Sequence, residues 1–347
     1  MKAVVLHAPH DLRLDEIEAA PAPGPGEVQI AVSHGGICGS DLHYYHHGGF
    51  GTVRVREPMA LGHEVSGTIT ALGAGVTGLA EGDLVAVNPS RPCGQCEYCR
   101  KGLAQHCLDM RFNGSAMRFP HEQGLFRAAV TLPAAQAVRL PAGTDLALAA
   151  MSEPLAVCLH AVAGAGSLVG KRVLVSGCGP IGCLTILAAR AAGAEEIIAT
   201  DIAAPALAGA RAVGADTVLD LAAAPDALAP YGEAKGRIDV AFECSGAPPA
   251  VLAALTVLRP QGLLVAVGLG PEVTLPVAAL VAREIRLQGS FRFDAEFATA
   301  ARAIAAGRID VSPLLTRVLP VAEATDAFTL ASDKARAMKV QIAFPSP

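Results

Sequence analysis

The amino-acid sequence predicts an α/β protein with two domains: a β-rich first domain and a doubly wound parallel sheet. Three observations predict this class. A chain of 347 residues is long enough for about two domains. Up to about residue 147 it consists of short β runs divided by Gly and Pro, without a long helical period. Beyond that point short apolar runs alternate with Ala- and Leu-rich segments of helical length, which is typical of a parallel sheet covered on both faces.

The first domain is expected over residues 1–150. Its β-rich runs are KAVVLHA, EVQIAVSHGGI, EVSGTITALGAG and DLVAVNPS. β-branched and apolar residues between glycines and prolines favour short strands joined by turns.

The second domain is expected over residues 151–288, and residues 289–347 are expected to fold back onto the first domain. Six apolar runs predict the strands of the second domain: KRVLVSG (171–177), EIIATD (196–201), TVLD (217–220), DVAFECSG (239–246), GLLVAVG (262–268) and EIRLQGS (284–290). Six strands alternating with helices match the doubly wound fold of the Rossmann type. The tail contributes two helix-like stretches and a last strand, MKVQIAF.

Composition argues against several classes of protein. The hydrophobic fraction of 52% fits a globular chain, and a net charge of -5 without a basic stripe argues against nucleic acid as the main partner. The start of the chain lacks the apolar core of a signal peptide, and no stretch of about 18 apolar residues predicts a membrane span. We therefore expect a cytoplasmic protein whose nine cysteines are metal ligands or buried thiols rather than disulfides.

A glycine-rich turn predicts a dinucleotide site. The strand RVLVS runs into GCGPIG, which places Gly177, Gly179 and Gly182 in the pattern G-x-G-x-x-G. Gly177 permits the tight turn, Gly179 lets the backbone approach a pyrophosphate, and Gly182 lets helix and strand pack closely. Asp201 ends the next strand and can accept hydrogen bonds from the adenosine ribose. No Arg or Lys follows it closely, so NAD is favoured over NADP; the alternative is an unrelated glycine turn with Asp201 as a helix cap.

Four clustered cysteines predict a structural metal site. Cys93, Cys96, Cys99 and Cys107 follow the spacing C-x2-C-x2-C-x7-C, which suits four thiolates around a tetrahedral zinc with no open position. Such a metal would hold a loop and do no chemistry. Free thiols, strained disulfides and an iron–sulfur cluster are the alternatives, but the ferredoxin spacing with its trailing proline is absent.

The stretch GGICGSDLHYYHHGG (35–49) is dense in groups that bind metals or carry protons. Cys38 alone is a weak metal signal, but LGHE (61–64) adds His63 and Glu64, and SEPLAV adds Glu153. Cysteine, histidine and carboxylate can form a three-ligand zinc site that keeps one position open for water or substrate. Spacing along the sequence does not show whether these groups meet in space.

The order of these motifs resembles that of the zinc-dependent medium-chain alcohol and polyol dehydrogenases. G-G-I-C-G-S-D-L-H, G-H-E, the four-cysteine lobe, E-P and G-x-G-x-x-G follow one another as in that family, over essentially the whole chain. The resemblance implies a GroES-like first domain and NAD(P)-dependent hydride transfer with two zinc ions per chain. It implies that Cys38, His63 and Glu64 bind the catalytic zinc, and that Glu153 contacts the zinc-bound water or the substrate. Ser40 would then pass the substrate's proton through the nicotinamide ribose to His43.

The resemblance also implies contacts to the cofactor and the substrate. The implied cofactor contacts are Gly177, Gly179, Pro180, Ile181, Gly182, Asp201, Ser245, Val267, Gly268, Ser290 and Phe291. The stretches DMRFNGSAMRFPH (109–121) and GSFRF (289–293) lie outside the generic motifs and are most similar to members that convert L-idonate to 5-keto-D-gluconate. Such a substrate needs a cation for its carboxylate and hydrogen bonds for its hydroxyls, for which Tyr44, Arg118 and Arg292 are the candidates.

Other functions stay open at this point. The alternatives are a sorbitol- or xylitol-type polyol dehydrogenase, a threonine dehydrogenase, and a non-catalytic NAD-binding zinc protein. Family resemblance also implies a homo-oligomer, either a dimer or a tetramer.

Overall fold

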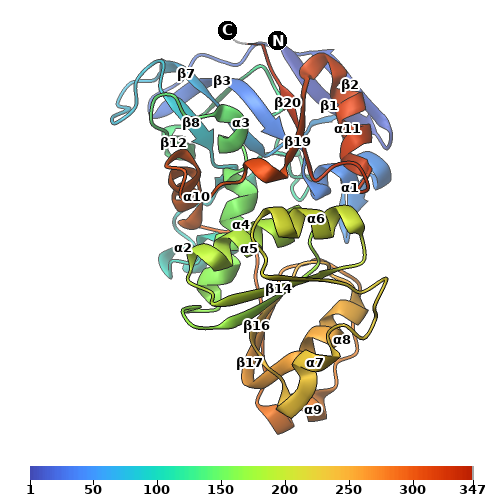
Figure 1. Ribbon diagram of the computed structural model, residues 1–347. Coiled ribbons are helices and arrows are strands. Elements are labelled where there is room, and N and C mark those ends of the chain that lie inside the picture. The colour runs from blue at the N-terminus through green and yellow to red at the C-terminus, as the bar shows by residue number, and fades with distance from the viewer. Residues whose placement is uncertain (346–347) are drawn as a thin grey trace.

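The computed structural model describes residues 1–345 and shows two lobes joined by helices (Figure 1). One lobe holds both the first strands of the chain and the last one, so the chain leaves this lobe and returns to it (Figure 1). Within the described residues, no helix is both long and apolar enough to cross a membrane.

The first lobe is built on a seven-stranded sheet with the order β12-β8-β7-β3-β20-β19, in which β11 also pairs with β3. The pairs are antiparallel except for β19 with β20. Val28, Ile30 and Val32 alternate along β3 and are buried, as expected for a strand with one face on the core. The strands are β3 (Glu27–Gly36), β7 (Glu64–Leu72), β8 (Leu84–Val87), β11 (Ala129–Pro133), β12 (Ala137–Arg139), β19 (Leu315–Pro320) and β20 (Lys339–Ala343).

Smaller elements complete this lobe. Its core includes the fully buried rings of Tyr44, Phe126 and Phe328. The small sheets are β1 (Lys2–Ala8), β2 (Asp11–Glu16) and β6 (Met59–Ala60); β4 (Gly49–Phe50) and β5 (Val53–Arg54); and β9 (Ser90–Arg91) and β10 (Arg111–Phe112). The helices are α1 (Gly39–His47), α2 (Glu97–Arg100), α3 (Leu146–Ala149) and α11 (Ala324–Ser332).

The second lobe is a six-stranded parallel sheet with the order β15-β14-β13-β16-β17-β18, which confirms the predicted doubly wound fold. Successive residues of β13 enter different cores: Val173 and Val175 belong to one cluster and Leu174 to the other. Both faces of the sheet are therefore covered, and this explains the continuous apolar runs. The strands are β13 (Arg172–Ser176), β14 (Glu196–Asp201), β15 (Thr217–Asp220), β16 (Ile238–Glu243), β17 (Leu258–Ala266) and β18 (Arg286–Gly289).

Helices flank this sheet and connect the lobes. The flanking helices are α5 (Pro180–Ala191), α6 (Ala204–Ala212), α7 (Ala229–Gly232), α8 (Pro248–Val257) and α9 (Val277–Arg283). The chain enters the second lobe through α4 (Ser152–Gly164) and leaves it through α10 (Glu296–Ala305). These two helices contact each other, and His160 of α4 lies 3.1 Å from Glu296 of α10. The two segments that connect the lobes, α4 and α10, are thus held together.

Candidate active site and zinc centres

The structure brings Cys38, His63 and Glu64 together: one ligand atom of each lies within 4.8 Å of the others. Strand pairing explains why they meet. Gly36 of β3 is the register partner of Glu64 of β7, so the residues just after β3 and just before β7 share one end of the sheet. Cys38 precedes the first residue of α1, and His63 precedes β7.

Asp41, in the first turn of α1, holds this cluster in place. Its Oδ2 accepts a hydrogen bond from the Cys38 amide at 3.0 Å, and its Oδ1 accepts one from the Gly62 amide at 3.3 Å. The same Oδ1 lies 3.6 Å from His63 Nδ1. A carboxylate on the far nitrogen of a histidine is the usual support for a metal-ligating imidazole.

The donor set fits a bound cation. Glu64 Oε2 is buried and lacks an aligned hydrogen-bond donor among the described residues, whereas buried polar atoms normally have one. Burial opposes a charged imidazole, but Asp41 and Cys38 outweigh it and raise the pKa of His63 well above its usual value. The surroundings therefore favour positive charge at this point, and a thiolate, an imidazole and a carboxylate are ligands that Zn²⁺ accepts.

Glu153 lies at the start of α4 and is almost fully buried. Burial raises the pKa of its carboxyl to about 7, with Glu64 adding to the rise and His63 opposing it. A carboxyl with this pKa can hold or release a proton near neutral pH, which suits a group beside reacting atoms.

The two predicted relay residues lie on α1. Ser40 is in its first turn and His43 is three residues later, so both are on one side of the helix. Burial lowers the pKa of His43, and His47 and Lys334 lower it further. His46 makes a different contact, with its Nε2 2.7 Å from the Ser332 hydroxyl. The shared side of α1 is compatible with the predicted relay of Ser40 and His43.

Arg292 is the predicted substrate contact whose guanidinium is left without an acidic partner. It lies over the rings of Phe112 and Phe291, with 4.3 and 5.0 Å from Cζ to the centroids. No carboxylate within residues 1–345 forms an ion pair with it. Phe112 in turn lies 5.7 Å from the His63 ring, which connects Arg292 to the metal cluster. The φ angle of Arg292 is +54°, a strained conformation of the kind that concentrates at functional sites.

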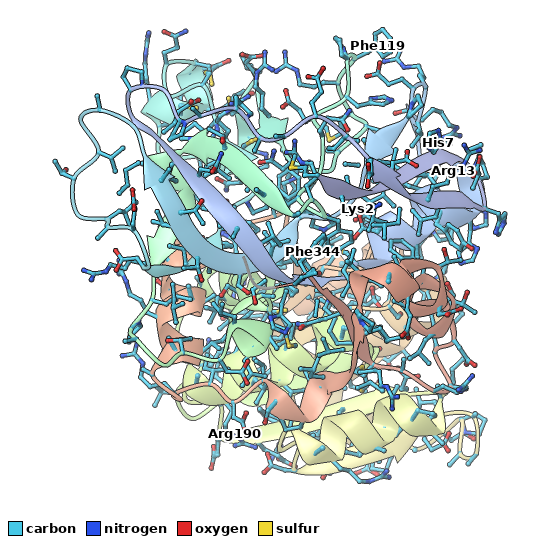
Figure 2. The ribbon with its side chains drawn as sticks, turned by 90° about the horizontal axis from the view of Figure 1, so that it is seen from above. Lys2, His7, Arg13, Phe119, Arg190 and Phe344 are labelled. Carbon is cyan, nitrogen blue, oxygen red and sulfur yellow. The ribbon has the colours of Figure 1, made fainter. Side chains whose placement is uncertain are left out.

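The other two predicted substrate contacts already have partners. Tyr44 is only 2% exposed, and its hydroxyl accepts a hydrogen bond from the Ala116 amide. Arg118 pairs with Asp109 on an exposed surface, and its neighbour Phe119 lies at the edge of the lobe in Figure 2. Either residue would need to exchange these contacts to bind substrate.

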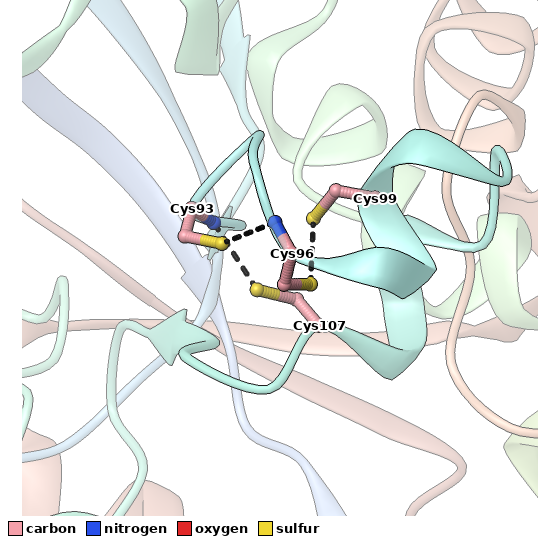
Figure 3. Close-up of side chains that lie close together, drawn as sticks. All are labelled: Cys93, Cys96, Cys99 and Cys107. Atoms are coloured by element: carbon pink, nitrogen blue, oxygen red, sulfur yellow. Dashed lines mark hydrogen bonds between the residues drawn. The ribbon is translucent and has the colours of Figure 1, made fainter.

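Cys93, Cys96, Cys99 and Cys107 form a second cluster, with one sulfur of each within 4.8 Å of the others (Figure 3). Backbone amides point at these sulfurs: Cys93 N lies 3.1 Å from Cys107 Sγ, and Cys96 N lies 3.4 Å from Cys93 Sγ. Amides from Cys99 and Leu108 lower the pKa of Cys96 to about 6. Such N–H groups favour thiolates, and four thiolates suit a closed zinc site. His106 is outside the cluster and stacks on Phe291.

The glycine-rich turn has the geometry that its pattern predicts. Gly177 has φ +87°, and a Cβ on Gly182 would lie 1.8 Å from the Gly177 carbonyl oxygen. A Cβ on Gly179, in contrast, would meet nothing within 4 Å, so the space above this residue is open to a ligand. Gly179 is also the N-cap of α5, whose first amides can bind a phosphate.

Asp201 also makes hydrogen bonds within the glycine-rich turn, which the sequence pattern does not indicate. Its Oδ2 accepts a hydrogen bond from the Cys178 amide at 2.6 Å, and its Oδ1 accepts one from the Ala203 amide at 2.9 Å. The carboxylate therefore also holds the turn. Arg190 pairs with Asp216 near the far end of α5 and lies at the molecular edge in Figure 2, away from this turn.

Sequence reasoning missed Lys339 of β20. Its side chain is buried beside Glu64, to which its Nζ donates a hydrogen bond of 2.7 Å. The only signal in the sequence was one charged residue in the mainly apolar final strand MKVQIAF.

A comparison with known proteins agrees with this architecture. The alcohol dehydrogenase GroES-like domain family matches residues 24–142, and the zinc-binding dehydrogenase family matches residues 180–306. The chain is 43% identical over 316 residues to L-idonate 5-dehydrogenase (NAD(P)(+)) of Escherichia coli strain K12, covering 91% of each chain. It is 38% identical to sorbitol dehydrogenase of Gallus gallus, covering 94% of this chain and 92% of the relative. The crystal structure of L-idonate 5-dehydrogenase from E. coli K-12 superposes with a TM-score of 0.94 at 40% identity, covering 99% of this chain and 98% of that one.

Proposed function

The chain is a zinc-binding dehydrogenase of the alcohol dehydrogenase GroES-like family, and from this membership we propose that it is an NAD-dependent L-idonate 5-dehydrogenase. The reaction is hydride transfer between the carbinol carbon of a polyhydroxy acid and a nicotinamide, with 5-keto-D-gluconate as the oxidised product. The 43% identical relative carries this activity in its name.

Cys38, His63 and Glu64 would hold the catalytic zinc, with Asp41 orienting His63. When bound, the metal supplies a Lewis acid that polarises the oxygen of the reacting carbon. Ser40 would accept the proton of the alcohol, and His43 would release it to solvent. Glu153, buried and close to the cluster, holds or releases a proton beside the substrate. The four-cysteine cluster would hold a second zinc that stabilises its loop.

The remaining cofactor contacts follow from the glycine-rich turn. The open space above Gly179 and the first amides of α5 would receive the pyrophosphate, and Asp201 would accept a bond from the adenosine ribose. Pro180, Ile181, Ser245, Val267, Gly268, Ser290 and Phe291 complete the proposed cofactor site. A negative charge at residue 201 disfavours a 2′-phosphate, which is the reason to prefer NAD over NADP.

The unpaired guanidinium of Arg292 is the observation that supports an acid as the substrate. A hydrogen bond to a charged group contributes about 1.5–3 kcal/mol, so a carboxylate on the substrate should raise kcat/KM by about tenfold or more. The test is the absorbance of NADH at 340 nm with L-idonate, sorbitol, xylitol and L-threonine, and its loss with 5-keto-D-gluconate. We expect L-idonate to exceed sorbitol by that factor.

Two results would favour a different function. Equal kcat/KM for sorbitol and L-idonate would favour a general polyol dehydrogenase, as the similarity to sorbitol dehydrogenase allows. Tight NAD binding with two zinc ions and no turnover of any substrate would favour a non-catalytic NAD-binding zinc protein.

We also propose that the chain works as a cytoplasmic homo-oligomer. β18 is the edge strand of the parallel sheet, so one row of its backbone groups has no strand partner. Leu287 of β18 and Val277 and Val281 of the neighbouring α9 are exposed apolar side chains. A second copy of the chain would cover this edge. Light scattering of the purified protein should give a dimer or a tetramer, and a monomer at micromolar concentration would refute this part.

A further inference from the structure

We propose that Lys339 is a positioning residue of the catalytic zinc site, which holds the carboxylate of Glu64 and the backbone before Cys38 in the arrangement that binds the metal. The inference rests on the proposed function, because it takes Cys38, His63 and Glu64 as the ligands.

The contacts of Lys339 are its first support. The residue begins β20 and is only 3% exposed. Its Nζ donates to Glu64 Oε1 at 2.7 Å and to the carbonyl oxygen of Ile37 at 3.1 Å. Ile37 directly precedes Cys38, and Glu64 directly follows His63. One ammonium group therefore joins the two segments that carry the three ligands.

The orientation of Glu64 is the second support. The ammonium group of Lys339 contacts both carboxylate oxygens: it donates a hydrogen bond to Oε1 at 2.7 Å and lies 2.5 Å from Oε2. The carboxylate is fully buried, so water does not compete for it. The ammonium therefore fixes the position of the whole carboxylate beside His63 and Cys38, as outer hydrogen bonds generally orient metal ligands.

The pairing of β20 with β3 explains how Lys339 reaches Glu64. β20 reaches the site from the C-terminal segment and pairs with the end of β3, with Gln341 opposite Gly36. Without Lys339 the carboxylate of Glu64 would stay buried with no positive partner, which is unfavourable in a protein interior. Glu64 would turn away from its present position, and this change would weaken metal binding.

The test compares Lys339→Met with Gln341→Met. Gln341 lies two residues further along the same strand and is also buried, but its amide bonds to Ala147 and touches no ligand. Zinc release to the chromogenic chelator 4-(2-pyridylazo)resorcinol is followed at both sites of each variant, together with the melting temperature. The four-cysteine site serves as an internal reference because Lys339 does not contact it.

We expect Lys339→Met to weaken zinc binding at the catalytic site by about 10–100-fold, the usual effect of losing an outer contact of a metal ligand. The four-cysteine zinc should be unchanged, Gln341→Met should leave both sites near wild type, and Lys339→Arg should retain part of the affinity. Equal zinc release from Lys339→Met and wild type would overturn the inference. Loss of both zinc ions together would indicate a general loss of folding, and the double variant then decides.

A double variant keeps the test informative if Lys339→Met alone misfolds. Lys339→Met combined with Glu64→Gln removes both charges. If Lys339 acts through that carboxylate, the double variant should bind zinc at the catalytic site about as weakly as Glu64→Gln alone. Additive effects would contradict the inference. A wild-type chain that binds one zinc only would instead refute the proposed function, so the two failures differ.

Discussion

The carboxylate of Glu64 occupies the space where a side chain of residue 36 would start: a Cβ built on Gly36 would lie 2.1 Å from Glu64 Oε2. The two residues are register partners on β3 and β7. The preceding glycine has a similar role, since a Cβ on Gly35 would lie 2.5 Å from the Phe126 ring. The absence of side chains at Gly35 and Gly36 therefore leaves the space that the Phe126 ring and the Glu64 carboxylate occupy.

We predict that Gly36→Ala displaces Glu64 and weakens zinc binding at the catalytic site by about 10–100-fold. Gly39→Ala is the matched control, because its added methyl group meets nothing within 4 Å and its φ is not in the left-handed region. The measurement is zinc content after dialysis against a chelator, with circular dichroism to verify the fold. Retention of both zinc ions by Gly36→Ala would show that Glu64 can shift without loss of the metal.

The glycines of the turn after β13 should respond differently from one another. Gly179→Ala adds a methyl group in open space, so the fold should be kept while the Kd for NADH rises. Gly182→Ala would place Cβ 1.8 Å from a backbone oxygen, and overpacking of this kind costs about 1–3 kcal/mol of stability. Fluorescence titration with NADH and thermal melting separate the two effects. Unchanged NADH affinity in Gly179→Ala would place the pyrophosphate elsewhere.

Two cysteine variants should separate the zinc sites. Cys38→Ser should lose one of two zinc ions and all measurable turnover, with most NADH binding kept, because the glycine-rich turn proposed to bind the cofactor lies in the other lobe. Cys99→Ser should lose the other zinc and lower the melting temperature, since a closed four-thiolate site contributes folding energy. Metal analysis and melting curves give the result. Near-normal activity of Cys38→Ser is incompatible with a catalytic metal at this site.

The pH dependence of turnover should reflect the protonation of the His43 imidazole. In alcohol oxidation this imidazole must be neutral to accept the proton, and its pKa is lowered from the usual 6.5 by burial, His47 and Lys334. The acid limb of kcat should therefore lie below pH 6.5, and ketone reduction should slow as pH rises through the same pKa. His47→Gln should move the limb upward, because it removes a like charge. A limb that is identical in His43→Gln and wild type would assign the titration to another group.

The fold could be predicted because its signals are local. The apolar runs of β13, β14, β16 and β17 are nearly continuous because both faces of the parallel sheet are buried there, and the glycine pattern fixes the turn after β13. The predicted runs agree with the observed strands to within a few residues; β17 begins earlier, at Leu258 rather than Gly262. Pairing of β3 with β7 then places Cys38 beside His63 and Glu64.

The contacts within the site could not be predicted, because they join residues that are distant along the chain. Lys339 is separated from Glu64 by 275 positions, and nothing in the final strand indicates a buried ion pair. Arg118 and Arg292 have the same chemistry in the sequence, yet one pairs with Asp109 on the surface and the other stacks on Phe112. Only tertiary packing distinguishes an arginine that is free for a ligand from one that is already paired.

This difference between the two arginines is itself testable. Arg292→Leu should raise the KM for L-idonate by about 10–100-fold, because a charge-assisted hydrogen bond of about 1.5–3 kcal/mol is lost. The KM for sorbitol, which has no carboxylate, should change much less. Arg118→Leu is the control, since removing an exposed ion pair costs at most about 1 kcal/mol of stability and should leave both KM values near wild type. If Arg118→Leu instead raises the KM for L-idonate, the pair with Asp109 opens on binding and Arg118 is the carboxylate partner. If Arg292→Leu raises both KM values equally, its guanidinium binds hydroxyls that the two substrates share.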